Sequence, residues 1–250
     1  MGYWPVVNDM MRDADIIVLV GDARMPELSL NRELMNKIER FNKAYVVAFN
    51  KADLISNDKI KELRELFKGA FFVSGRKNEG IGELKKALLI IAKKMKIENP
   101  KIGIVGYPNV GKSAVINALA HRARAKIENK PGTTKGIQWV KVGSLRVLDS
   151  PGVIPYEDKN KELALLGSKS VEKMKNPEYI ACEIIKMFLH KDREKLKEYY
   201  KLESVEGDEY EILLAIGKRR GYLKKKGEID ENRTSATIIR EWQNGYLGFK

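Results

Sequence analysis

Short, continuously apolar runs alternate along the first part of the chain with longer stretches in which apolar residues recur every three or four positions. The continuous runs predict strands covered on both faces, and the periodic stretches predict amphipathic helices. Strands are predicted at residues 16–20, 44–49, 70–74, 101–106, 137–142 and 145–149, and helices at 28–42, 57–68, 80–96 and 112–121. The alternation favours an α/β domain with a mainly parallel sheet and helices on both faces. The last two strands, joined at Gly143-Ser144, predict one antiparallel hairpin.

The pattern changes after about residue 160, where no run has the character of a strand. Residues 178–200, 208–217 and 231–244 have helical periodicity. We therefore expect an α/β domain over residues 1–174 and a small all-helical domain over residues 175–250.

Composition and charge narrow the class of protein. The 250 residues include 47 Lys and Arg against 34 Asp and Glu, for a net charge of +13. Fourteen of the basic residues and only two acidic ones lie between Lys85 and Arg146. Such a concentrated positive field favours a polyanionic partner, although a solubilising surface is the alternative.

The single cysteine, Cys182, leaves no disulfide partner within the chain and excludes a Cys-rich zinc site. It is compatible with a reducing compartment, so we expect a cytoplasmic protein. No apolar run reaches the roughly 18 residues of a membrane span, so no membrane association is expected.

Residues 106–113, GYPNVGKS, match the phosphate-binding pattern G-x-x-x-x-G-K-[ST]. They follow a predicted strand and precede a predicted helix, where backbone N–H groups and the helix N-terminus converge on phosphate oxygens. Lys112 is expected to reach the β- and γ-phosphates, and the Ser113 hydroxyl to ligate Mg²⁺. The remaining predicted nucleotide contacts of this loop are Asn109, Val110, Gly111 and Ala114.

Two further segments fit the same phosphate site. Asp149 ends a predicted strand, where a carboxylate can hold Mg²⁺, and the N–H of Gly152 can face a γ-phosphate. Between this segment and the phosphate loop lies PGTT, in which Thr134 is a candidate Mg²⁺ ligand. We assign Lys112, Thr134 and Gly152 to catalysis.

A base-binding segment, Asn50-Lys51-Ala52-Asp53, directly follows the second predicted strand. Asp53 can accept the N1–H and 2-amino donors of guanine, Asn50 can bond the opposite edge, and the Lys51 stem can pack beside the ring. Asp53 as a helix cap is the alternative. Because Ser74-Gly75 follows the next strand and can offer an N–H to guanine O6, the guanine interpretation is favoured.

Together these five motifs resemble those of Ras-like GTPases, but in the order base, base, phosphate, switch I, switch II. This order resembles that of the circularly permuted GTPases, as does the segment DARMP at residues 22–26. The C-terminal residues 217–248 are similar to the YlqF/RbgA branch. The resemblance implies hydrolysis of GTP to GDP and phosphate with Mg²⁺, slow intrinsic turnover stimulated by a partner, and assembly of the large ribosomal subunit with rRNA as that partner. Two alternatives stay open: a nucleotide-dependent RNA-binding module with negligible turnover, and a GTPase of tRNA modification or translation.

Two details of the chemistry are not settled by the motifs. Val153 occupies the position where many GTPases carry Gln, and valine cannot orient water by hydrogen bonding, so the water-orienting group stays unassigned. Asn109 resembles the residue that ligates K⁺ in potassium-stimulated GTPases, but a loop-stabilising Asx turn is an equal alternative.

A basic cluster in the C-terminal domain is the candidate RNA-binding surface. Its residues are Lys218, Arg219, Arg220, Tyr222, Lys224, Lys225 and Lys226, with no acid among them. The cations can bind RNA phosphates and the tyrosine can stack on an unpaired base, while a solvated helix end is the alternative. The basic stretch 121–130 beside switch I adds to the case for RNA.

Overall fold

The structure, a computed structural model, describes residues 4–121, 126–127, 139–150, 152, 160–169, 171–174 and 176–249. It divides into two compact units, residues 1–157 and residues 158–250. The candidate residues Thr134 and Val153 lie outside the described residues.

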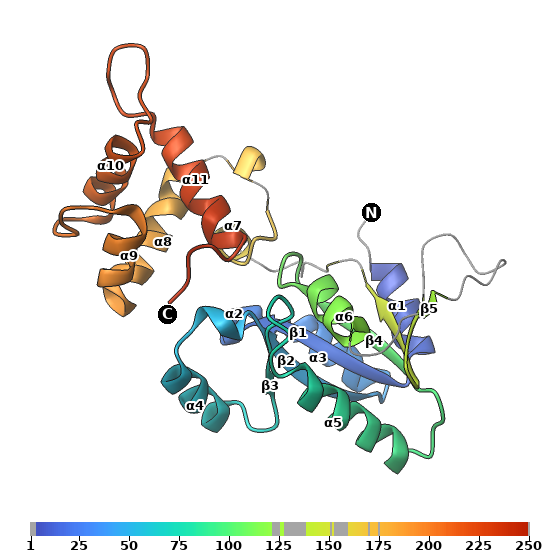
Figure 1. Cartoon of the computed structure of the whole chain (residues 1–250). Helices are drawn as coiled ribbons and strands as arrows, with labels where there is room; N and C mark the ends of the chain where they lie inside the picture. The colour runs from blue at the N-terminus through green and yellow to red at the C-terminus, as the bar shows by residue number, and fades with distance from the viewer. Residues whose placement is uncertain are drawn as a thin grey trace. The chain divides into compact units, whose positions relative to one another are not determined.

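A seven-stranded sheet forms the first unit, in the order β3-β2-β1-β4-β7-β6-β5 (Figure 1). Its strands are β1 (Ile16–Asp22), β2 (Ala44–Asn50), β3 (Phe71–Phe72), β4 (Lys101–Gly106), β5 (Lys126–Ile127), β6 (Trp139–Val142) and β7 (Leu145–Asp149). The first five in sheet order run parallel, whereas β7, β6 and β5 pair antiparallel. The predicted mainly parallel sheet and the 143–144 hairpin are confirmed; β5 was not predicted.

Helices cover both faces of this sheet, as predicted (Figure 1). They are α1 (Trp4–Asp13), α2 (Pro26–Ser29), α3 (Arg32–Arg40), α4 (Asn57–Leu66), α5 (Ile81–Lys94) and α6 (Lys112–His121), with a short 3-10 helix η1 (Ala52–Leu54). On one face, α1 and α3 bury a cluster with β1, β4 and β7; on the other, α5 packs beside α6. The carboxyl ends of the central parallel strands therefore meet at one open edge, where ligands of such sheets bind.

Helix α1 is a finding beyond the sequence analysis. Its residues Val7, Met10 and Met11 are buried against the sheet. A Cβ on Gly103 of β4 would lie 2.2 Å from the sulfur of Met10, so the glycine makes room for this helix. The predicted helix 28–42 is also divided in two, because the buried Asn31 side chain caps α3 by accepting from the N–H of Leu34.

The second unit is helical, as expected. It contains α7 (Asn160–Leu165), η2 (Val171–Lys173), α8 (Pro177–Lys191), α9 (Arg193–Tyr200), α10 (Glu209–Arg219) and α11 (Glu231–Gln243). The predicted single helix 178–200 is two helices, because Asp192 leaves the helical conformation and caps α9 through the N–H of Lys195. The unit also begins at residue 158, earlier than the predicted boundary at 174/175, because α7 contacts α8 and η2 contacts α11.

Aromatic packing holds this second unit together. Trp242 and Phe188 are fully buried, with ring centroids 6.0 Å apart, and the Trp242 indole N–H donates to the carbonyl of Leu165 at 2.9 Å.

Half-buried Cys182 lies in α8; burial, with nearby Glu209, raises the pKa of its thiol to about 11. In the described ranges of the chain, no helix combines the length and apolar character needed to span a bilayer.

Candidate functional site

The phosphate loop connects β4 to α6 and contains two glycines, Gly106 and Gly111, that have close neighbours. A Cβ on Gly106 would lie 2.3 Å from the carbonyl oxygen of Val20, and the backbone there has φ 150°. Lys112, the first residue of α6, donates its ammonium to the carbonyls of Tyr107 at 2.8 Å and Gly106 at 3.3 Å. The loop thus combines a compact backbone, a helix N-terminus and a nearly buried cation, which together favour an anion.

Gly152 lies against this loop. A Cβ on Gly152 would come within 2.6 Å of the backbone nitrogen of Pro108, so only glycine fits this approach without a shift of the backbone. Asp149 ends β7 opposite Ile104 of β4. The phosphate loop begins at the end of this neighbouring strand. The structure therefore brings Gly152 and the end of β7 next to the phosphate loop.

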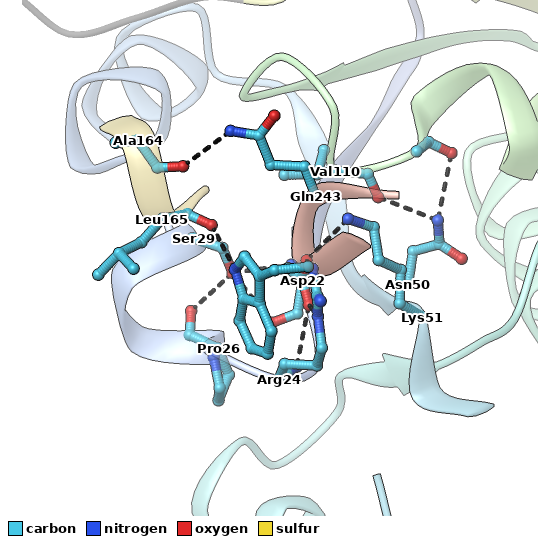
Figure 2. Close-up of polar contacts among 12 residues, drawn as sticks. Asp22, Arg24, Pro26, Ser29, Asn50, Lys51, Val110, Ala164, Leu165 and Gln243 are labelled. Carbon is cyan, nitrogen blue, oxygen red and sulfur yellow. Dashed lines mark hydrogen bonds and ion pairs between the residues drawn. The ribbon is translucent and has the colours of Figure 1, made fainter. Parts of the chain in front are cut away.

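Asn50 joins the base-binding segment to the phosphate loop. Its side-chain amide donates to the carbonyls of Val110 at 3.0 Å (Figure 2) and Gly111 at 3.3 Å. Its Oδ1 accepts from the N–H of Gly75 at 2.9 Å. From their motifs, Asn50 is predicted to bond an edge of guanine and the Gly75 N–H to face guanine O6. Both groups bond to protein here, so Asn50 acts as a brace between three segments of the site, and their contacts with guanine stay predictions.

The Ser74-Gly75 turn packs directly on α6. A Cβ on Gly75 would lie 2.6 Å from the backbone carbonyl carbon of Ala114, and Ser74 is fully buried. A side chain at position 75 would therefore push the turn away from the helix that begins with Lys112. The turn is thus fixed against the start of α6, which follows the phosphate loop.

Asp53 lies inside η1, with its side chain nearly buried at 9% exposure. The alternative of a helix cap is excluded, since α4 is capped by Ser56, whose hydroxyl accepts from the N–H of Lys59. In the part of the chain that the structure describes, no hydrogen bond or ion pair engages the Asp53 carboxylate. Both carboxylate oxygens therefore remain acceptors, which fits the two donors of guanine.

Asp22, Arg24 and Lys51 form a buried ion cluster. The sequence motifs did not predict this cluster. Asp22 ends β1, and its carboxylate accepts from the Arg24 side chain at 3.0 and 2.8 Å and pairs with the Lys51 ammonium at 3.0 Å (Figure 2). Burial would raise the pKa of Asp22, but Arg24 and Lys51 outweigh it and hold this pKa well below its usual range. Burial lowers the pKa of Lys51, and the Asp22 charge opposes this.

The comparisons with known proteins agree with this geometry. Residues 101–217 match the family described as 50S ribosome-binding GTPase. Ribosome biogenesis GTPase A of Bacillus cereus is 32% identical over 259 residues, which cover 97% of this chain and 87% of that protein. The chain belongs to this YlqF/RbgA-like family of circularly permuted GTPases.

Two other similarities bear on the GTPase. An uncharacterized GTP-binding protein of Methanocaldococcus jannaschii is 39% identical over 246 residues, and the chain spans 98% of its own length but 65% of that relative. The GDP-bound structure of YlqF from T. maritima has a TM-score of 0.63 at 24% identity, with 98% of this chain and 96% of that one covered. This structural similarity confirms the fold.

The basic cluster of the GTPase lies in the second unit, on the end of α10 and the turn that follows. Lys218, Arg219, Lys224, Lys225 and Lys226 are exposed. Arg220 is also exposed but pairs with Glu241 at 3.2 Å, and the guanidinium of Arg233 lies 4.4 Å from the ring centroid of Tyr222. Two of the residues predicted to bind RNA thus have partners within their own domain.

Proposed function

We propose that this GTPase hydrolyses GTP to GDP and phosphate and acts as a nucleotide-gated assembly factor for the large ribosomal subunit. The observation that carries the proposal is the Asn50 brace, which joins the base-binding segment, the Gly75 turn and the phosphate loop into one nucleotide site. The relatives named Ribosome biogenesis GTPase A supply the direction of the biological role.

Within this proposal, each motif residue has a task. Asp53 reads the N1–H and 2-amino group of guanine, Lys112 neutralises charge on the β- and γ-phosphates, and the Gly152 N–H contacts the γ-phosphate. The close glycine approaches at Gly106 and Gly152 fit a loop shaped around phosphate oxygens.

Mg²⁺ is the expected cofactor. In the described ranges no group of three His, Cys, Asp or Glu residues is placed to hold a metal ion. A mixed set of Ser113, Thr134 and Asp149 with phosphate oxygens suits Mg²⁺, which is bound through few protein ligands and several waters or phosphates. When bound, Mg²⁺ would neutralise the negative charge that develops on the phosphates during transfer.

Asn109 is the proposed K⁺ ligand, and its local conformation bears on that role. Its backbone is left-handed, with φ 60°, which asparagine tolerates in turns. If K⁺ binds there, hydrolysis is faster in KCl than in NaCl at equal ionic strength, whereas equal rates would reject the role.

The guanine-reading role of Asp53 has its own test. An Asp53→Asn variant should shift preference from GTP toward xanthosine triphosphate.

Positive charge supports a ribosomal partner. The exposed lysines of the second unit and the excess of basic residues between Lys85 and Arg146 suit the phosphates of rRNA. Phosphate contacts of this kind supply affinity without sequence specificity, so the proposal names the class of partner and not a site on it.

Steady-state hydrolysis with and without purified large subunits tests the function. Stimulation by large subunits, absent with small subunits, is the expected result. A flat, negligible rate would favour the RNA-binding module, and binding to tRNA without sedimentation with large subunits would favour the tRNA or translation role. A Lys112→Met variant serves as the matched inactive control.

A further inference from the structure

The GTPase contains a buried carboxylate that belongs to none of the nucleotide-binding motifs, yet lies in contact with one of them. Asp22 ends β1 opposite Asn50 of β2, and its side chain is fully buried. Its partners are Arg24, from its own turn, and Lys51, the residue between Asn50 and the base-reading Asp53. Figure 2 shows the Lys51 and Arg24 side chains converging on this one carboxylate.

Lys51 has two acidic residues within its electrostatic reach. Its ammonium lies 3.0 Å from Asp22, and both Asp22 and Asp53 raise the pKa of Lys51 against the effect of burial, with the contribution of Asp22 the larger. Because Lys51 and Asp53 are two residues apart in a tight turn, a pair between them is the local alternative. Such a pair would occupy the carboxylate oxygens that guanine needs.

The backbone around Lys51 favours the arrangement seen. Lys51 itself adopts the left-handed conformation at φ 63°, and the N–H of Ala23 donates to the carbonyl of Asn50 at 2.8 Å. The ends of β1 and β2 are therefore fixed together, with the Lys51 ammonium at the Asp22 carboxylate. Arg24 adds two side-chain hydrogen bonds and one backbone hydrogen bond to the same carboxylate, which keeps it charged and in place.

We infer that Asp22 is a specificity-determining positioning residue: it binds the Lys51 ammonium and so keeps the Asp53 carboxylate open for guanine. This inference rests on the proposed role of Asp53 in reading guanine. Arg24 has a supporting part, since it orients Asp22 and balances its charge. Neither Asp22 nor Arg24 is expected to contact the nucleotide.

The test is the ratio of GDP to IDP affinity, since inosine lacks the 2-amino group that Asp53 accepts from. Asp22→Asn keeps the side-chain shape but releases the Lys51 ammonium to Asp53, so the ratio should fall about tenfold, the scale of one charge-assisted hydrogen bond. Removing the ammonium as well, in Asp22→Asn with Lys51→Met, should restore the ratio to that of Lys51→Met alone. A merely structural role would not give this rescue.

Controls separate the inference from its premises. Asp15→Asn removes a carboxylate at the opposite end of β1, which accepts from the N–H of Lys101, and should leave the ratio unchanged. If Asp22→Asn is too unstable to measure, Asp22→Asn with Arg24→Gln leaves no unpaired buried guanidinium and should show the same low ratio. Thermal unfolding of every variant shows which ones are folded.

The inference is overturned if the ratio is unchanged in Asp22→Asn or in Asp22→Asn with Arg24→Gln. It is also overturned if Asp22→Asn with Lys51→Met keeps a ratio below that of Lys51→Met alone. Asp53→Asn should lower the ratio more than any other change. If Asp53→Asn leaves the ratio at the wild-type value, the guanine-reading role of Asp53 is overturned, and the inference with it.

Discussion

The nucleotide site and the basic cluster use charge in opposite ways. At the nucleotide site, Asp22, Arg24, Asn50 and Lys112 are nearly or fully buried and bonded to other protein groups at 2.8–3.3 Å. In the basic cluster, Lys224, Lys225 and Lys226 are exposed, and the described residues offer them no ion pair. Buried charges act through fixed geometry, whereas exposed charges act through a summed field. We therefore expect large single-residue effects in the first region and smaller, additive, salt-dependent effects in the second.

The largest effect is expected at Lys112. Lys112→Met removes the cation that bonds to the carbonyls of Gly106 and Tyr107 in the phosphate loop, and GTP hydrolysis should fall at least about 100-fold, as is typical when a charge-stabilising group is lost. The measurement is steady-state phosphate release. Lys59→Met, at an exposed lysine of α4, is the control and should keep the wild-type rate. Substantial activity in Lys112→Met would contradict the comparison.

The second effect concerns the brace. Asn50→Ala removes hydrogen bonds to Val110, Gly111 and Gly75, and GDP affinity should fall about 30-fold, or ~2 kcal/mol, since each lost bond contributes about 0.5–1.5 kcal/mol. Equilibrium titration with a fluorescent GDP analogue measures this change.

Asn31→Ala is the matched control for the brace, because Asn31 is also buried but caps α3. It should lower the free energy of unfolding by ~1 kcal/mol and leave GDP affinity unaltered. Equal losses of GDP affinity in the two variants would show that Asn50 matters only for folding.

A smaller effect is expected in the second unit. Lys225→Glu with Lys226→Glu should weaken binding to large-subunit rRNA about tenfold in low salt and reduce the salt dependence by about two counterions, with intrinsic hydrolysis unchanged. Lys59→Glu with Lys61→Glu makes the same charge change on α4, at lysines already paired with acids. Equal losses for both double variants would assign the effect to net charge alone.

The smallest effect near neutral pH is that of Asp22 protonation. Because its folded pKa is lowered from the ordinary 3.8, its contribution to stability is complete above that value and is lost as acid approaches the folded pKa. Denaturant unfolding at pH 6 and pH 3 should show a steeper loss for the wild type than for Asp22→Asn. Asp58→Asn, at an exposed carboxylate, should behave like the wild type.

The same contrast explains what the sequence could predict. Lys112, Asn50 and Asp53 could be predicted as site residues because each belongs to a motif that directly follows a strand, and Gly152 because it follows β7. The role of Asn50 was not predictable, since an amide can bond a base or a backbone and only the fold decides. The Asp22 cluster joins the end of β1 and the turn after it to Lys51, which follows β2. The local segment DARMP contains Asp22 and Arg24 but does not show that Lys51 pairs with them.

The remaining differences have local causes. Helix α1 has only three buried residues in ten positions and a proline near its start, so its periodic signal is weak. Tertiary packing stabilises it. At Asp192, one residue ends α8 through its backbone and caps α9 through its side chain, which periodicity does not detect. The Asn31 cap divides the predicted helix 28–42 in the same way.

The permuted order of strands also has a consequence for biosynthesis. β1 lies in the middle of the sheet, with β2 made soon after it and β4 much later. Val110, the partner of Asn50 in the phosphate loop, is synthesised 60 residues after Asn50. This separation corresponds to roughly 3–12 s at typical elongation rates. During that interval the nascent chain presents β1 as an open edge, a surface that invites mispairing until residues 101–106 emerge and cover it.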